Sequence, residues 1–193
     1  MNLTEMGLRT SLAQIYFGEI LMDKSKSCCF SGHRSTHFDM DASYMGGVLR
    51  DMLQKAVHEA MDVGFKTFYS GMAIGFDIIA AEIVMQEKQG RSDDEINLIA
   101  VVPFLQQEAK WGAKWRKRHD DVLRAADKIV VLNERYIRGC YHERNRYLVD
   151  NSARLIGLFS GKTGGTSHTF AYAEKEGLDI VNLWQSIDSQ EPL

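Results

Sequence analysis

Short apolar runs alternate with longer amphipathic stretches along this chain from Ser27 to Trp184. The apolar runs have the length and the β-branched and aromatic content of buried strands, and they cover residues 27–31, 65–70, 96–102, 128–132, 154–159 and 178–184. Between them, apolar residues recur every three or four positions, which predicts helices at 45–61, 75–89, 109–126, 141–152 and 166–176. The pattern therefore predicts an α/β fold, a Rossmann-like three-layer sandwich with a mostly parallel sheet of about six strands.

The first 24 residues precede this alternation, and we interpret them as an N-terminal extension to a single domain at 25–193. Apolar residues at helical spacing make residues 12–22 a candidate amphipathic helix. An appended helix, a partner-binding segment and a start codon placed too early all agree with this stretch, and the sequence does not choose among them. The stretch lacks the basic start and the clean apolar core of a secretory signal peptide.

The composition is that of an ordinary folded protein, with 45% hydrophobic and 25% charged residues in 193 positions. The formal net charge of −3 argues against nucleic-acid binding through overall charge, although a local basic patch stays compatible with it. No apolar stretch approaches the roughly 20 residues of a membrane-spanning helix, so we expect no membrane partner. Adjacent Cys28 and Cys29 would point to opposite faces of a strand, and free thiols fit a reducing, cytoplasmic location. No metal-ligand spacing is present, so no metal site is predicted.

An aromatic residue followed by Ser-Gly closes an apolar run three times, at residues 30–32, 69–71 and 159–161. In an open parallel sheet such turns gather along the carboxyl edge of the strands, where ligands bind. Glycine lets backbone N–H groups approach a ligand closely, and helix N-termini add partial positive charge. Together the turns predict one site for a phosphorylated, nucleotide-like ligand.

The first turn brings Gly32, His33 and Arg34 to the end of a strand. Arginine and histidine beside a glycine turn can bind phosphate, with arginine supplying a two-point grip. Solvation of these two side chains, or pairing with Asp39 and Asp41, is the alternative.

The second turn contains Ser70 and Gly71, then Gly75 and Asp77 at the start of a helix. Its GxxxG spacing is not the GxGxxG dinucleotide fingerprint, yet its glycines would still present N–H groups to a ligand. Asp77 falls in the first turn of the helix, where a carboxylate is favoured electrostatically, and it could also bind a ribose hydroxyl. The sequence leaves both roles of Asp77 open.

The third turn places Gly164 and Gly165 directly before Thr166, a good N-cap for the next helix. A glycine pair at a helix start suits an anion cradle, so phosphate binding is favoured here. The GxxxxGK[ST] order of a P-loop is absent. The polar segment 136–151 follows a strand that ends at the same edge, and Arg144 and Asn145 are expected to turn inward from it.

A basic run at residues 110–119 surrounds Trp111 and Trp115. A cationic helix with tryptophans could bind single-stranded nucleic acid. Core packing of the tryptophans beside solvated lysines is the alternative, and we favour it.

Four motifs occur together in this chain: SGHR at 31–34, SGMAIGFD at 70–77, VPF at 102–104 and RNRYLVD at 144–150. Their combination resembles the YpsA-like family of the SLOG superfamily, which also includes the LOG phosphoribohydrolases and the DNA-processing protein DprA. The resemblance covers about residues 28–184. It implies a Rossmann-like domain that binds nucleotides or nucleotide-derived ligands, and a homodimer, since members often self-associate.

The glycine turns also resemble the two glycine-rich motifs of the LOG enzymes. Residues 71–77 resemble the first motif, and residues 164–166 resemble the second, a PGGxGTxxE pattern. No proline precedes Gly164, and His168 and Thr169 stand where the glutamates of that family would follow. Cleavage of an N-glycosidic bond needs a carboxylate near the ribose. Because the glutamates are missing, we favour ligand binding over hydrolysis as the function.

The leading hypothesis is a nucleotide-binding domain that acts as sensor or regulator, with a nucleotide or ADP-ribose-like molecule as ligand and no established cofactor. The predicted ligand-binding residues are Gly32, His33, Arg34, Ser70, Gly71, Gly75, Arg144, Asn145, Gly164, Gly165 and Thr166. The alternative is an N-glycosidic hydrolase of nucleoside monophosphates or NAD-like ligands, with Asp77 and Glu143 as catalytic residues and Glu174 as a further candidate. A third hypothesis is DprA-like single-stranded nucleic-acid binding through residues 110–119.

Overall fold

The computed structural model describes residues 15–17, 22–33, 44–91 and 95–188. Within them the chain forms one sheet with the strand order β1-β5-β4-β3-β2-β6-β7. The strands are β1 (Ile15–Phe17), β2 (Ser27–Gly32), β3 (Thr67–Ser70), β4 (Asn97–Val102), β5 (Lys128–Val131), β6 (Arg154–Leu158) and β7 (Asp179–Asn182). Every neighbouring pair of these strands runs parallel, which confirms the predicted α/β fold.

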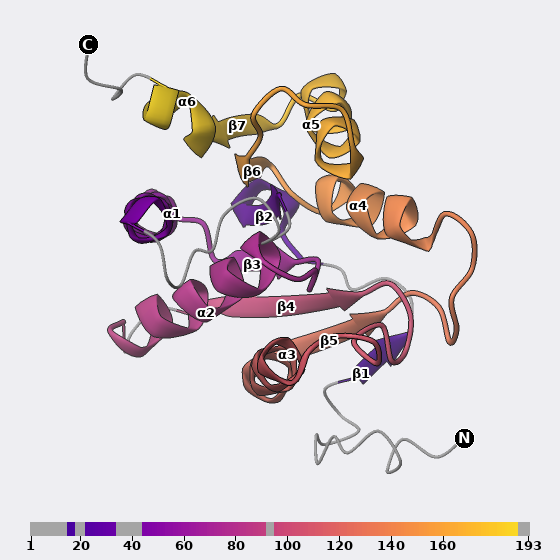
Figure 1. Ribbon diagram of the computed structural model, residues 1–193. Helices are drawn as coiled ribbons and strands as arrows, with labels where there is room; N and C mark the ends of the chain where they lie inside the picture. The colour runs from indigo at the N-terminus through magenta and orange to yellow at the C-terminus, as the bar shows by residue number, and fades with distance from the viewer. Residues whose placement is uncertain (1–14, 18–21, 34–43, 92–94, 189–193) are drawn as a thin grey trace.

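Helices cover both faces of the sheet (Figure 1). They are α1 (Tyr44–Asp62), α2 (Phe76–Gln89), α3 (Ala113–Ala125), α4 (Cys140–Asp150), α5 (Gly165–Lys175) and the short α6 (Leu183–Asp188). In Figure 1, α1, α2 and α3 lie on one side of the sheet, and α4 and α5 lie on the other. This is the Rossmann-like three-layer arrangement that the sequence predicts. In the part of the chain that the structure describes, no helix has the length and apolar content needed to cross a membrane.

Each face of the sheet has its own apolar core. Cys28 packs with Leu53 of α1 on one face, whereas Cys29 packs with Leu148 of α4 and Phe170 of α5 on the other. Adjacent residues of β2 therefore point to opposite faces, as predicted. Strands buried on both faces are apolar at nearly every position, which explains why the sequence shows continuous apolar runs rather than alternation.

The strand order reverses at β2. From β2 the chain adds β3, β4 and β5 on one side, and it then returns to place β6 on the other side of β2. Residues 28–32 of β2 pair in register with residues 154–158 of β6. The connections that leave these two strands lead to helices on opposite faces, which opens a crevice at their carboxyl ends.

Two elements differ from the sequence prediction. Ile15–Phe17 form strand β1 beside β5, where residues 12–22 were a candidate helix, so this part of the extension joins the sheet as a seventh strand. The periodicity of such a short run of β-prone residues is compatible with a helix or a strand. Here the run forms a strand because it pairs with the edge of β5. At the other end, Leu183–Asp188 form α6 instead of continuing the strand expected at 178–184. Residues 1–14 and 18–21 lie outside the described part of the chain.

Candidate functional site

A cleft of about 300 Å³ opens at the carboxyl ends of β2 and β6. Four segments line it: residues 31–33, Ala73 with Asp77, Tyr141 with Arg144 and Asn145, and residues 162–166. Each of the three glycine turns singled out in the sequence contributes residues to this one cleft. The cleft therefore lies at the point of strand reversal, where open α/β sheets bind their ligands.

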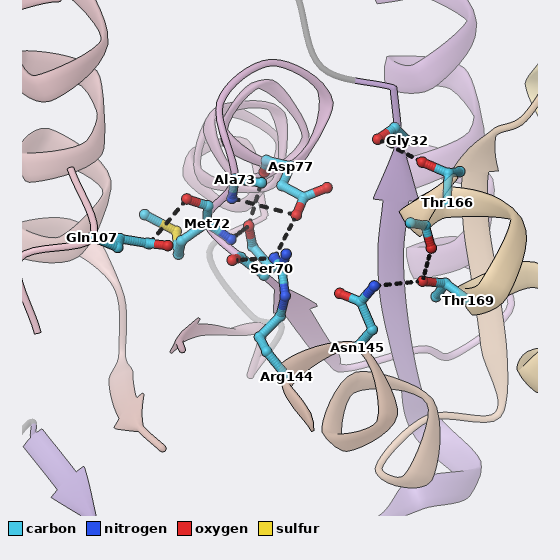
Figure 2. Close-up of polar contacts among 12 residues, drawn as sticks. Gly32, Ser70, Met72, Ala73, Asp77, Gln107, Arg144, Asn145, Thr166 and Thr169 are labelled. Carbon is cyan, nitrogen blue, oxygen red and sulfur yellow. Dashed lines mark hydrogen bonds and ion pairs between the residues drawn. The ribbon is translucent and has the colours of Figure 1, made fainter. Parts of the chain in front are cut away.

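Hydrogen bonds hold the end of β2 against the start of α5. The N–H of Ser160 donates to Nε2 of His33 at 3.2 Å, and the Ser160 hydroxyl lies 3.0 Å from the same nitrogen. The hydroxyl of Thr166 donates to the carbonyl of Gly32 at 3.2 Å (Figure 2). These contacts join residues 127 and 134 positions apart in the chain, so this wall of the cleft forms only from distant segments.

An ion pair between Asp77 and Arg144 forms another part of the wall (Figure 2). Nη1 of Arg144 lies 2.9 Å from Oδ2 of Asp77, and both side chains are 7% exposed. The same guanidinium group donates to the carbonyl of Gly71, and the N–H of Ala73 donates to Asp77 at 3.4 Å. The turn before α2 and the helix α4 therefore hold this carboxylate between them.

Polar groups also stabilise the turn between β3 and α2 from within. The hydroxyl of Ser70 donates to the carbonyl of Asp77 at 2.8 Å and accepts from the N–H of Met72 at 3.3 Å. Met72 has a φ of 57°, an unfavourable region for a residue with a side chain. Its carbonyl accepts a 3.1 Å hydrogen bond from Gln107, whose amide nitrogen lies 3.2 Å from Nε2 of His119. Burial lowers the pKa of His119, so the neutral ring can accept that hydrogen bond.

The N-terminus of α5 faces the cleft with open space around it. A Cβ added at Gly164 or Gly165 would meet no other atom within 4 Å. The side chain of Asn145 donates to Thr169 at 2.7 Å, and Thr169 donates to the carbonyl of Gly165 at 3.1 Å, so α4 and α5 are joined just below this point. The first N–H groups of a helix lack partners within the helix and carry partial positive charge. This end of the cleft is therefore suited to an anion.

The charges that line the cleft favour a negative ligand. Asp77 and Arg144 offset each other as an ion pair, and Lys162 is exposed beside the start of α5. An exposed ammonium group next to a helix N-terminus attracts phosphate or carboxylate. The cleft thus combines a cation, a helix start and room for close approach.

Comparison with known proteins assigns this chain to a family. The model of the YpsA SLOG family matches residues 28–180. The chain belongs to this family. A UPF0398 protein of Halalkalibacterium halodurans is 30% identical to this YpsA-family chain over 130 residues, covering 66% of the chain and 68% of the relative. The SPbeta prophage-derived protein YoqJ of Bacillus subtilis, described as uncharacterized, is 26% identical over 150 residues, covering 71% and 86%.

Among solved structures, this YpsA-family chain is similar to DNA processing protein A from Helicobacter pylori, reported with a unique single-stranded DNA binding mode. The TM-score is 0.56 at 18% sequence identity, and the match covers 80% of this chain and 63% of that one. At this level of identity the likeness shows the shared Rossmann-like fold.

The predicted site residues that line the cleft of this YpsA-family protein are Gly32, His33, Asp77, Arg144, Asn145, Gly164, Gly165 and Thr166. Ser70, Gly71 and Gly75 are not among the described lining residues, and they shape the turn behind the cleft instead. A Cβ at Gly71 would overlap the guanidinium of Arg144, and Gly75 has a φ of 95° directly before α2. Their contact with a ligand stays a prediction, and Arg34 lies outside the described residues.

The two carboxylates proposed for hydrolysis are separated by the fold. Asp77 lines the cleft, whereas Glu143 is exposed and accepts a 2.8 Å hydrogen bond from the side chain of Asn133. Adjacent positions of a helix face different directions, so Arg144 and Glu143 on α4 do not reach the same place. Within the described lining residues, Asp77 is the only carboxylate.

Five cleft residues of this YpsA-family chain were not among the predicted site residues: Ser31, Ala73, Tyr141, Lys162 and Thr163. Lys162 and Thr163 lie inside the third turn, where the phosphate prediction rests on the glycines and the helix cap. Tyr141 lies three positions before Arg144 on α4 and shares its helix face. This three-residue spacing could have predicted Tyr141 from the sequence. Arg144 was expected to turn inward, and residues three positions apart on a helix lie on the same face.

The basic run at 110–119 has internal partners in this YpsA-family fold. The guanidinium of Arg118 binds the carboxylate of Glu82 through two nitrogens, at 2.7 and 2.5 Å, and lies 4.4 Å from the ring centre of Trp115. Trp111 and Trp115 both pack against the core under α1–α3. These contacts agree with the core-packing alternative for the tryptophans.

Proposed function

We propose that this chain binds a phosphorylated, nucleotide-like small molecule in the cleft at the carboxyl ends of β2 and β6 and acts as a sensor or regulator. The observation that carries the proposal is the meeting of residues 31–33, Asp77 and 162–166 in one hollow of about 300 Å³ at the strand reversal. That volume lies at the lower end of the range for small-molecule sites.

The phosphate of this ligand binds at the start of α5. The N–H groups of Gly165 and Thr166 and the ammonium of Lys162 supply the positive charge there, whereas the N–H of Gly164 donates to the hydroxyl of Ser167 at 2.9 Å. The open space at Gly165 supports this placement, because no neighbouring protein atom lies where a side chain would be. The carboxylate of Asp77, at the other part of the wall, is the natural acceptor for a ribose hydroxyl.

The contacts of two residues, Thr169 and Asp77, favour binding over hydrolysis as the activity. Thr169 stands where the LOG resemblance expects a glutamate, and its hydroxyl is engaged with Asn145 and the carbonyl of Gly165. The carboxylate of Asp77 is engaged by Arg144 and by the N–H of Ala73. A general base must activate a water molecule at the sugar. The bonds at Thr169 and at Oδ2 of Asp77 fix these side chains in place, which suits acceptance of a hydrogen bond from a ribose hydroxyl better than activation of water.

A binding screen on the full chain tests the proposal. The probes are inorganic phosphate, ribose 5-phosphate, AMP, ADP-ribose and NAD, measured by thermal shift and calorimetry, with mass spectrometry for released base. We expect at least one phosphorylated probe to bind saturably and to raise the unfolding free energy, by about 2.7 kcal/mol at one hundred times its Kd. Release of free base would indicate hydrolysis, and absence of binding by every probe would refute the proposal.

Substitutions at the start of α5 locate the binding. Lys162→Met should raise the Kd of the bound probe about tenfold, because it removes a charge-assisted contact to phosphate. Lys175→Met makes the same change at the far end of α5, outside the cleft, and should leave the Kd unchanged. Equal effects of the two substitutions would place the phosphate elsewhere.

The proposal includes a reducing, cytoplasmic setting, because Cys28, Cys29 and Cys140 are all buried free thiols. A homodimer is the assembly expected from the superfamily resemblance. Light scattering on the purified chain measures the assembly directly.

A further inference from the structure

Three aromatic side chains gather beside the cleft. Phe104 follows β4, Tyr136 lies between β5 and α4, and Tyr141 lies in the first turn of α4. The ring centres are 5.5 Å apart for Phe104 and Tyr136, 5.9 Å for Phe104 and Tyr141, and 6.4 Å for the two tyrosines. Both contacts of Phe104 are edge-to-face, at 83° and 70°. We refer to these three residues as the aromatic cluster.

The aromatic cluster is open to solvent. Tyr136 is 60% exposed and Tyr141 is 38% exposed, and the neighbouring Ile137 is 45% exposed. Among the described residues, the remaining large hydrophobic side chain in this exposed class is Val63, just past α1. Exposed apolar surface is therefore concentrated at one place, which is typical of a binding surface. The edge-to-face contacts fix the rings without covering them, so the surface is already arranged before a ligand arrives.

The aromatic cluster is continuous with the cleft. Tyr141 belongs to both, because its side chain lines the cleft and its ring contacts Phe104 and Tyr136. It also shares a face of α4 with Arg144, whose guanidinium is part of the cleft wall. A ligand that lies along the cleft thus meets aromatic rings at Tyr141.

Resting on the proposed function, we propose that the aromatic cluster is the subsite for the base of the nucleotide. The flat face of the base stacks on the exposed rings of Tyr136 and Tyr141 while the phosphate binds at the start of α5. Half-buried Phe104 contacts both rings and holds them in position. The ligand is then a base-containing nucleotide rather than a sugar phosphate, and stacking tolerates any of the four bases because each has a π face.

Calorimetry on the full chain with ribose 5-phosphate and the 5′-monophosphates of adenosine, guanosine, cytidine and uridine tests this subsite. For the wild-type chain, we expect nucleotides to bind about tenfold more tightly than ribose 5-phosphate. Tyr136→Ala should remove most of that gain and leave the Kd of ribose 5-phosphate unchanged. Tyr136→Phe keeps the ring and should retain the gain. Val63→Ala, an exposed apolar substitution outside the aromatic cluster, should change neither Kd.

The outcomes separate the subsite from the proposed function. If the wild-type chain binds neither ribose 5-phosphate nor any nucleotide, and also fails to bind inorganic phosphate, ADP-ribose and NAD, both proposals are refuted. If ribose 5-phosphate binds and nucleotides bind no more tightly, the base subsite alone is refuted. A single-stranded oligonucleotide is the third probe. If Tyr136→Ala weakens its binding but leaves the mononucleotide gain intact, the aromatic cluster is a nucleic-acid surface and the base subsite is refuted.

Discussion

The guanidinium group of Arg144 on α4 lies 2.9 Å from the carboxylate of Asp77 on α2. The two helices pack on opposite faces of the sheet, so this ion pair joins the two helical layers at the carboxyl edge of the strands. Both side chains are almost completely buried. The shape of the cleft and the stability of the fold therefore depend on the same pair of charges.

Arg144→Met should lower the free energy of unfolding by about 3 kcal/mol, because it leaves a buried carboxylate without its cation. Urea unfolding followed by circular dichroism measures this loss. Asp77→Asn removes the opposite charge, and the double substitution should recover part of the loss because no uncompensated charge remains. Strictly additive losses would contradict a coupled pair. Lys117→Met is the matched control, since its partner Asp121 is exposed and the pair contributes less than about 1 kcal/mol.

Gly71→Ala should destabilise the protein by more than about 2 kcal/mol, whereas Gly165→Ala should change stability by less than about 1 kcal/mol. The added methyl group at Gly71 overlaps the guanidinium of Arg144, and the one at Gly165 enters open space. Urea denaturation of both variants supplies the comparison. A Gly71→Ala protein as stable as the wild type would mean that Arg144 can bind elsewhere at no cost.

Acidification should weaken the fold through His119. Burial lowers the pKa of its imidazole below the ordinary 6.5, against the opposing influence of the Glu108 and Asp120 carboxylates. Between the lowered folded value and about 6.5 the unfolded chain binds a proton that the folded chain does not, so the free energy of unfolding falls as the pH drops below about 6.5. Protonation also turns Nε2 into a donor facing the amide of Gln107.

Urea unfolding between pH 5 and 8 measures this dependence, with a slope of at most about 1.4 kcal/mol per pH unit from one proton. His119→Gln should reduce the slope, whatever its effect on stability at neutral pH. His142→Gln, at an exposed position of α4, should preserve it. Identical slopes in the wild type and His119→Gln would exclude His119 as the titrating group.

The cysteines should be almost unreactive in the native protein. Cys28, Cys29 and Cys140 are fully buried, and burial raises the pKa of Cys28 well above its ordinary value and that of Cys29 to about 12. Thiolate is the reactive form, so modification by an aromatic disulfide reagent at pH 8 should proceed at least about a thousandfold more slowly than in urea. Absorbance of the released thiolate follows the reaction, and a rapid first phase would show that a thiol is accessible.

The layered fold was predictable because its signals are local. The apolar run at 96–102 has the continuous apolar character of a strand covered on both faces, and β4 spans Asn97–Val102. The helical stripe at 45–61 stops before Gly64, which has a φ of 100° in the structure, as expected of a glycine just past a helix. The gathering of the glycine turns followed from the same alternation, since parallel strands place their carboxyl ends at one edge.

The sequence did not predict which glycines pack against another side chain and which border open space. Gly71 and Gly165 look alike as turn residues, yet one makes room for a side chain 73 positions away and the other borders open space. Gly32 likewise lies where a Cβ would overlap the ring of Phe76. Such packing depends on partners that are distant in the chain. Local sequence patterns do not identify these partners. The strand at Ile15–Phe17 escaped prediction for the same reason, because its partner is β5.

The pairing of β2 with β6 has a consequence for synthesis on the ribosome. The nascent chain exposes β2 early, and the strand that covers its second edge emerges only after β3, β4 and β5 are complete. Until then the edge of β2 offers unpaired backbone groups to other chains. The hydrogen bonds of His33 and Gly32 also need Ser160 and Thr166, so a product that stops before residue 160 lacks this wall of the cleft. Under the proposed function, a ligand can therefore stabilise only chains that extend at least as far as Thr166.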